Sequence, residues 1–270
     1  MSSTYTPYLQ IPTLLDIKAD DTLLVASDIT KLALTTMRTE KLFNTLQFIN
    51  ALQQQVSKGT LLFPAFVNGL KSGHIFDVKN SLPQTGTLAV TAFKNNDFVR
   101  TTDPFHSFMV WGKYANQLSN LKNKSTFGTN SVFAFLHTIK GKMLLIDIDL
   151  QHSFTFAHYV EELENVKYRA FKTYNINCIY NNGDNEIRDI LFFEKQKGVT
   201  LNLNGLYPLF KQKGALTEYK INGSLFTLID FEKSAQIIKN DITLNKAKNL
   251  HSFSYSLWLK MITKKLINKK

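Results

Sequence analysis

A histidine and a carboxylate three residues apart, His158 and Glu161, are the side chains in this chain best placed to do chemistry. They follow a nearly continuous apolar run, residues 143–150, which predicts a buried strand that gives way to a helix. On a helix, positions i and i+3 lie on one face, so the imidazole and the carboxylate can meet. Such a pair at the carboxyl end of a strand suits a general base and the partner that orients it. A hydrogen-bonded core histidine and a solvated glutamate in the acidic stretch 161–164 are the alternatives.

The elements that must position this pair predict an α/β protein. Residues 23–28 are typical of a short buried strand, 38–57 carry apolar residues at helical spacing, and 60–64 begin a second strand. Strand, helix and strand in this order are typical of a βαβ unit with parallel pairing. Residues 143–150 are apolar enough for a strand covered on both faces. We therefore expect a single domain over 1–270, with a mixed central β-sheet flanked by helices.

The remaining segments complete this prediction. Residues 68–106, rich in Gly and Pro, are expected to form a long connector, which in a compact domain tends to be functional. A third strand is expected over 107–111, a helix over 131–140, and β-like structure over 166–203 with a turn at 181–184. Helices are expected at 206–213, at 230–238 and in a Lys-rich C-terminal segment over 246–270.

Composition excludes several classes of protein. The single cysteine, Cys178, cannot form a disulfide within the chain, and the histidines lack metal-ligand spacing, so no metal site is expected. No stretch approaches 18 consecutive apolar residues, and the N-terminal decapeptide is polar, so neither a membrane span nor a signal peptide is expected. These features predict a cytoplasmic protein.

The net charge of +11 is concentrated near the C-terminus, where residues 233–270 contain nine Lys and one acid, Asp241. Because this excess is Lys-only and not interleaved with Arg, no nucleic-acid partner is expected. Lys260, Lys264 and Lys265 alternate with apolar residues, so weak peripheral contact with an acidic membrane is one interpretation. A docked helix with a solvated basic face is the other, and the oligomeric state is not predicted.

Four further segments accompany the His158–Glu161 pair in a fixed order. They are residues 25–29 (VASDI), 64–66 (PAF), 100–107 (RTTDPFHS) and 127–131 (FGTNS), followed by 155–161 (TFAHYVE). In this order the chain resembles the aminoglycoside 3-N-acetyltransferase family, also called the antibiotic N-acetyltransferase family. The resemblance covers about residues 10–170 and implies this family's fold, acetyl-CoA as cosubstrate and N-acetyltransferase activity.

The resemblance also implies roles for individual residues. His158 corresponds to the presumed general base and Glu161 to its partner. Ala26 and Asp103 stand where the family often has His, while Arg100, Ser107 and Ser131 match its motifs. The residues expected to bind acetyl-CoA are Ser27, Asp28, Pro64, Phe66, Arg100, Asp103, Ser107 and Ser131.

These roles agree with the chemistry of amide formation. Amines are mostly protonated at neutral pH, so a base with a pKa near 7 must accept a proton as the amine attacks. Arg100, Ser107 and helix N-termini can hold the phosphates of coenzyme A. Asp103-Pro104 as a simple turn, Ser107 and Ser131 as ordinary N-caps, and His106 as a structural residue are the alternatives.

The acceptor is expected to be an amino sugar. Aminoglycosides are polycations that call for a carboxylate-rich site, and acids beyond residue 161 are scattered. We therefore interpret the chain as closer to the family's relatives in surface-polysaccharide, including lipopolysaccharide, biosynthesis, with a nucleotide-linked amino sugar as acceptor. The alternatives are an aminoglycoside acceptor, with a role in antibiotic resistance, and a non-catalytic module that binds coenzyme or sugar.

Overall fold

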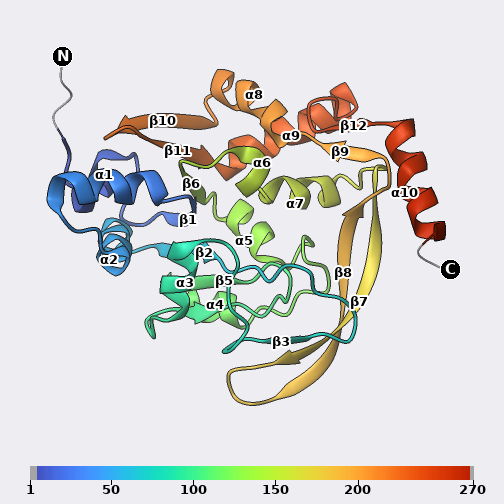
Figure 1. The fold of residues 1–270 in the computed structure, drawn as a ribbon, viewed down its shortest axis with the longest axis horizontal. Helices are drawn as coiled ribbons and strands as arrows, with labels where there is room; N and C mark the ends of the chain where they lie inside the picture. The colour runs from blue at the N-terminus through green and yellow to red at the C-terminus, as the bar shows by residue number, and fades with distance from the viewer. Residues whose placement is uncertain (1–4, 268–270) are drawn as a thin grey trace.

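A seven-stranded mixed sheet in the order β10-β11-β6-β1-β2-β5-β4 forms the centre of the molecule (Figure 1). The structure, a computed structural model, describes residues 5–267, with side chains as far as residue 263. The strands are β1 (Thr22–Ser27), β2 (Thr60–Pro64), β4 (Val99–Arg100), β5 (Phe108–Gly112), β6 (Lys142–Ile146), β10 (Leu216–Ile221) and β11 (Ser224–Asp230). β1 pairs in parallel with β2 and β6, and the other neighbours are antiparallel. The predicted fold class is therefore confirmed, including the parallel βαβ unit.

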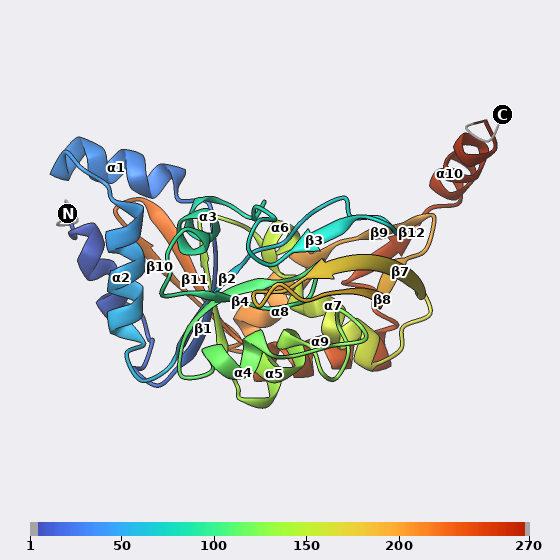
Figure 2. The same ribbon diagram turned by 90° about the horizontal axis from the view of Figure 1, so that it is seen from below.

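Hydrophobic cores cover both faces of this sheet because side chains alternate along its strands. In β1, Leu23 and Val25 belong to one core, and Leu24 and Ala26 to the other. The first core is closed by η1 (Tyr8–Leu14), α1 (Thr30–Glu40), α2 (Thr45–Gln55) and α3 (Thr87–Phe93). The second is closed by α4 (Ala115–Ser119), α5 (Val132–Thr138), α6 (Leu150–Ser153), α7 (Phe156–Leu163), η2 (Leu203–Leu206), α8 (Tyr207–Gln212) and α9 (Phe231–Asn245). Figure 2 shows α4, α5, α7 and α9 together below the sheet.

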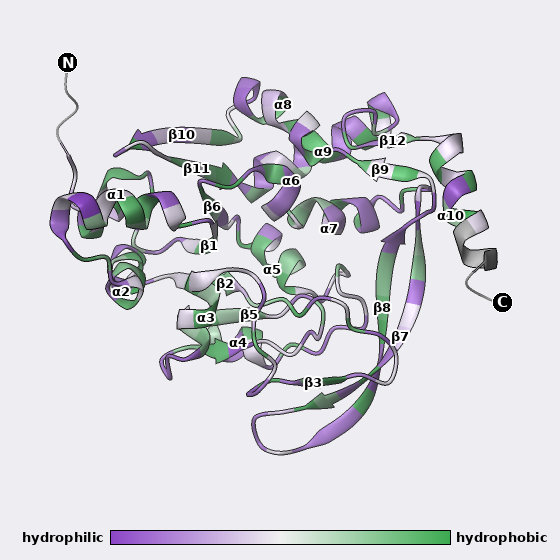
Figure 3. Ribbon diagram, in the orientation of Figure 1, coloured by the Kyte–Doolittle hydropathy of each residue, from purple (hydrophilic) through white to green (hydrophobic). Residues whose placement is uncertain are grey.

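A long two-stranded ribbon runs along one side of the molecule (Figure 1). It consists of β7 (Arg169–Ile179) and β8 (Asn185–Lys195), and β3 (Ile75–Asp77) pairs in parallel with β7. Its turn lies at the predicted position and is hydrophilic (Figure 3). A further small pair joins β9 (Val199–Leu201) to β12 (His251–Phe253).

Local backbone geometry changes three of the predicted elements. The helix predicted over 38–57 is wrong as a single element, because Lys41 adopts a left-handed φ of 69° that ends α1 before α2 begins. The strand predicted over 143–150 ends at Ile146, because Asp147 has a φ of 49° and Asp149 caps α6 through its carboxylate. The connector predicted over 68–106 contains β3, α3 and β4. It therefore contributes β4 to the central sheet and β3 to the sheet of the β7–β8 ribbon.

The C-terminal helix predicted over 246–270 is also interrupted. Lys246 takes a left-handed φ of 56° and ends α9, and β12 follows before α10 (Tyr255–Ile267). Figure 2 shows α10 projecting away from the body of the molecule. The side chains of Lys264 and Lys265 lie outside the described residues. Of the helices in the described part of the chain, none is both long and apolar enough to cross a membrane.

Candidate active site

Helix α7 brings His158 and Glu161 together as their spacing predicts. His158 Nδ1 lies 2.7 Å from Glu161 Oε2. Thr155 precedes the first turn, and α7 is amphipathic, with Phe156, Ala157, Tyr159 and Val160 buried in the core below the sheet. This packing fixes the rotation of α7 about its axis and so the direction of the imidazole.

Glu161 is a wholly buried carboxylate, with an exposed fraction of 0%. Tyr168 Oη donates a hydrogen bond to its Oε1 at 2.7 Å, and Arg169 Nε forms an ion pair with its Oε2 at 2.7 Å. Burial alone raises the pKa of Glu161, but the hydrogen bond of His158, the charge of Arg169 and the hydrogen bond of Tyr168 act against it, and the pKa lies below its ordinary value. Glu161 is therefore ionised at neutral pH.

The imidazole of His158 is neutral at the same pH. Burial is the largest cause that lowers its pKa below 6.5, the charge of Arg169 acts in the same direction, and Glu161 opposes both. Arg169 Nη2 also lies 2.7 Å from Nδ1 of His158. The imidazole Nδ1 can either accept or donate one hydrogen bond, so it bonds to Arg169 or to Glu161 but not to both. A lone pair on Nδ1 would repel the carboxylate at 2.7 Å, so we assign the proton to Nδ1, which then donates a hydrogen bond to Glu161. Nε2 is then the basic nitrogen, as a general base requires.

Sequence reasoning missed Tyr168 and Arg169, which hold Glu161 in place. Arg169 is buried and its Nη1 donates to the Phe193 carbonyl at 2.8 Å, so it joins β7, β8 and α7. A signal was available in the sequence, since only four of the 32 basic residues are Arg. In a Lys-rich chain, rare Arg marks sites that need a planar, multiply bonding cation. Three of the four, Arg100, Arg169 and Arg188, are indeed buried.

His158 opens onto a cavity of about 440 Å³. The wall includes Phe127, Thr155 and Arg169 on one side and Phe192, Glu194 and Lys195 of β8 on the other. A second cavity of about 260 Å³ lies under the loop 67–70 and is lined by Phe105 and Tyr174 as well. Both cavities are lined by His106, Phe192 and Glu194, so they lie side by side along this wall, and the two together are called the groove below.

The predicted coenzyme residues of the first two motifs lie at the carboxyl edge of the sheet. Ser27 ends β1 half-buried, and Asp28 is exposed and accepts a hydrogen bond from the Thr30 backbone N–H. Pro64 ends β2 and is buried. Phe66 follows it, and its ring packs edge-on against His106 at 4.4 Å between centroids. Phe66 thus contacts the wall of the groove.

The remaining predicted coenzyme residues are buried and bonded within the protein. Arg100 donates to the Ala65 carbonyl at 2.7 Å, to the Ser81 carbonyl, and through Nε to Ser107 Oγ at 3.0 Å. Burial lowers the pKa of Arg100 to about 10. Ser131 accepts from the Ala134 N–H and caps α5. Contact of Arg100, Ser107 and Ser131 with coenzyme A stays a prediction.

Asp103 organises a turn beside the groove. Its Oδ1 accepts hydrogen bonds from the backbone N–H groups of Phe105 at 2.9 Å and His106 at 2.7 Å. Asn123 donates to its other oxygen. The turn-forming role considered for Asp103-Pro104 is therefore present in the structure, and contact of Asp103 with coenzyme A stays a prediction.

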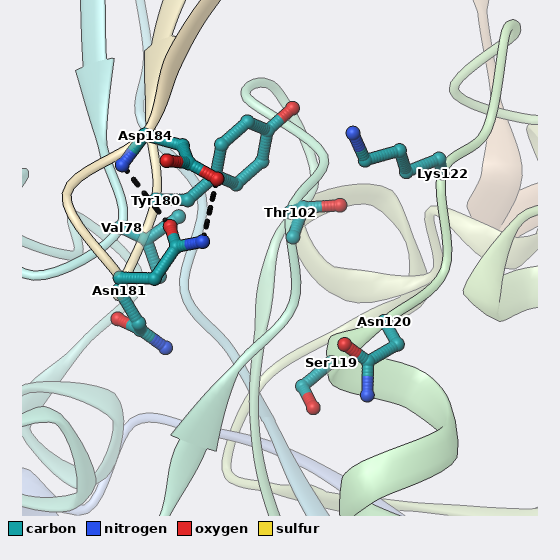
Figure 4. A pocket seen from close by; sticks show the side chains of 9 residues that line it. Val78, Thr102, Ser119, Asn120, Lys122, Tyr180, Asn181 and Asp184 are labelled. Atoms are coloured by element: carbon teal, nitrogen blue, oxygen red, sulfur yellow. Dashed lines mark hydrogen bonds between the residues drawn. The ribbon is translucent and has the colours of Figure 1, made fainter.

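A separate polar hollow of about 300 Å³ lies near the tip of the β7–β8 ribbon (Figure 4). It is lined by Thr102, Lys122, Tyr180 and Asp184 among others, and shares no lining residue with the two cavities beside His106. It contains none of the predicted site residues. Across the part of the chain that is described, no three His, Cys, Asp or Glu side chains gather as a metal site would require.

Comparison with solved structures places this fold among the acetyltransferases. The structure titled "AAC-IIIb binary with CoASH" aligns with a TM-score of 0.74 at 17% identity, over 90% of this chain and 98% of that one. The YokD protein from Bacillus subtilis aligns with a TM-score of 0.74 at 16% identity, over 91% and 96%. A mutant of aminoglycoside acetyltransferase AAC(3)-IVa in complex with apramycin gives a TM-score of 0.68 at 18%, over 91% and 95%. No curated protein sequence matches the chain.

The chain belongs to the aminoglycoside 3-N-acetyltransferase family, whose model matches residues 42–242. It is accordingly an acyltransferase that uses acetyl-CoA as cosubstrate and acetylates an amine. The family resemblance expected from the motifs is confirmed. A closer relation to polysaccharide-biosynthesis relatives is not supported by these comparisons.

Proposed function

We propose that this enzyme transfers the acetyl group of acetyl-CoA to a primary amine of an amino sugar, with His158 as general base. The observation that carries the proposal is an imidazole whose Nδ1 lies 2.7 Å from the buried carboxylate of Glu161 and which lines a cavity of about 440 Å³. A base with this tautomer can take a proton at Nε2, and Glu161 then stabilises the imidazolium.

The reaction proceeds by addition and elimination at the thioester carbon. As the amine nitrogen forms its bond to that carbon, Nε2 of His158 takes the amine proton and the carbonyl electrons move to oxygen. Collapse of the tetrahedral intermediate restores the carbonyl and breaks the C–S bond. The leaving thiolate takes the proton back from His158, so an amide and free coenzyme A result.

The groove offers space for both substrates. The cavity under the loop 67–70 has apolar walls at Val67, Leu70 and Phe105, which suit the pantetheine arm. The larger cavity beside His158 then receives the amine. In this arrangement the acyl carbon lies near His106 and Phe192, where the two cavities meet.

An aminoglycoside-type amino sugar is the acceptor that the comparisons favour. The family carries this activity in its name, and the titles of neighbouring structures describe complexes with apramycin, gentamicin and sisomicin. This support is better than that for a nucleotide-linked acceptor.

The nucleotide-linked amino sugar is retained as a second candidate because of the charges around the cavity. Arg169 is paired with Glu161, and Glu194 lies 3.5 Å from Lys172 as an ion pair. Among the described residues no ion pair includes Lys195, and this lysine lines the cavity. A lysine in this position favours an anionic group such as a phosphate over a polycation.

A panel assay tests the proposal. Purified enzyme, acetyl-CoA and a thiol reagent are combined with kanamycin-type amines and with nucleotide-linked amino sugars. Thiol release with the former only supports the aminoglycoside acceptor, and release with the latter only supports the second candidate. His158→Ala should lower kcat by about 100–10,000-fold with little change in acetyl-CoA affinity. Binding of acetyl-CoA with no thiol release for any amine would indicate a non-catalytic module instead.

A further inference from the structure

His106 is an imidazole that the proposed reaction does not yet use, although it lies where the two ends of the groove meet. Its ring lines the 260 Å³ cavity and the 440 Å³ cavity. The ring of Phe127 touches both histidines, with centroids 5.0 Å from His106 and 5.5 Å from His158. The two imidazoles therefore flank one phenyl ring on the wall of the groove.

Aromatic packing holds the His106 ring in one orientation. Phe66 packs edge-on at 4.4 Å and Phe192 stacks at 5.7 Å between centroids. The backbone is fixed as well, because Asp103 accepts hydrogen bonds from two successive N–H groups, including that of His106. A side chain held in this way need not reorganise during a reaction, which is the property that makes a dipole effective at a developing charge.

The same surroundings fix the proton of the ring. Burial is the main cause that lowers the pKa of His106 to about 3, and the nearby His158 adds to it, so the ring stays neutral. Nδ1 is buried without a hydrogen-bond partner among the described residues. A buried N–H without a partner is rarer than a buried acceptor without one, because the donor loses its only bond. The proton therefore belongs on Nε2, the nitrogen left to face the groove.

We propose that His106 is a further catalytic residue, whose Nε2–H donates a hydrogen bond to the thioester oxygen and to the oxyanion that forms there. This inference rests on the proposed acetyl transfer. When the amine attacks under the action of His158, the carbonyl electrons move to oxygen, and that charge needs a donor on the side away from the base. His106 donates without losing its proton, so the proton balance of the reaction is unchanged.

Two substitutions separate this role from simple packing. His106→Phe keeps an aromatic ring among Phe66, Phe127 and Phe192 but removes the donor. It should lower kcat by about 100–1,000-fold, the cost of one oxyanion donor, while acetyl-CoA affinity stays nearly constant. His106→Gln places an amide N–H close to the former Nε2 and should retain most of the wild-type kcat, whereas His106→Asn places it near the buried Nδ1 and should not. His152→Gln, at an exposed histidine on α6, serves as the control.

A spectroscopic measurement keeps this inference distinct from the proposed function. Acetyl-CoA labelled with ¹³C at the thioester carbonyl is bound without any amine, and its carbonyl stretch is recorded by infrared difference spectroscopy. The band should lie at lower frequency in the wild type and in His106→Gln than in His106→Phe. Equal bands, equal kcat values for His106→Phe and the wild type, or equal kcat values for the Gln and Asn variants would overturn the role of His106. A wild type that releases no thiol with any amine, but shows the shifted band, would refute the proposed acceptor chemistry alone.

Discussion

In the proposed mechanism, the charge state of His158 is the residue-scale property on which activity depends. Burial is the largest single cause and lowers the pKa of His158. The charges of Arg169 and Lys195 also lower this pKa, whereas Glu161 raises it. Because the pKa falls below 6.5, the imidazole is already neutral at pH 7, and its Nε2 carries no proton that must first be removed. His106 adds no charge, since it is neutral over the working range.

A pH profile tests this balance. The proposed general base is the neutral form of His158, so kcat should fall as pH drops through a pKa that lies below 6.5. The sign for stability is the same. The unfolded chain binds a proton at His158 near pH 6.5 and the folded chain only at lower pH, so acid favours unfolding in that interval. The acid limb of the profile, over which kcat falls with decreasing pH, is measured under saturating acetyl-CoA. It should be absent in His158→Ala. A limb centred above 6.5 would contradict the neutral imidazole.

Glu161→Gln tests the buried ion pair. The amide removes the charge that faces Arg169 and His158, which leaves a buried guanidinium without its counterion. Breaking one side of such a pair costs about 3–5 kcal/mol, so the urea midpoint should fall markedly. Glu232→Gln, which breaks the exposed ion pair with Lys140, is the matched control and should change little. A similar midpoint for both variants would show that Glu161 is not held as a buried carboxylate.

At the scale of elements, short helices and the β7–β8 ribbon assemble the site. α7 presents His158, the start of β7 supplies Arg169, and the end of β8 closes the cavity with Phe192 and Lys195. Nothing in the local pattern of 166–203 indicates that the two ends of this ribbon meet beside α7. The antiparallel pairing of Arg169 with Lys195 places them there.

Ser131 allows the helix-capping role and the predicted coenzyme role to be separated. Ser131→Ala removes the side chain that accepts from the Ala134 N–H, and loss of such a cap costs about 1 kcal/mol. Ser131→Asn keeps a capping oxygen and should restore most of this stability. Calorimetric titration with acetyl-CoA then isolates the second role. Unchanged affinity in both variants would assign Ser131 to capping alone.

At the scale of the whole molecule, the C-terminal helix α10 projects away from the catalytic body (Figure 2). Phe253, Tyr255, Leu259 and Met261 are exposed on β12 and α10, within the Lys-rich part of the chain. The weak membrane contact considered for this segment stays a prediction. Sedimentation with vesicles should recover more protein with anionic than with zwitterionic lipid, and the difference should vanish at high salt. Equal recovery from both lipids would leave the segment as a solvated helix.

Sequence alone determined the features that depend on neighbours along the chain. The i, i+3 spacing put His158 and Glu161 on one helix face, the apolar runs defined the parallel strands β1, β2 and β6, and the motif order gave the family. The break of α1 at Lys41 and the end of β6 before Asp147 were missed, since left-handed backbone at a non-glycine residue has no strong sequence signal.

Only the tertiary structure decided which distant residues share the site. Tyr168 and Arg169 fix Glu161, and His106 meets Phe192 and Phe127, because the ribbon folds back over the turn that Asp103 organises. The charge state of each imidazole was equally beyond the sequence. It depends on burial and on the cations nearby, and both are set by packing between segments that lie far apart in the chain.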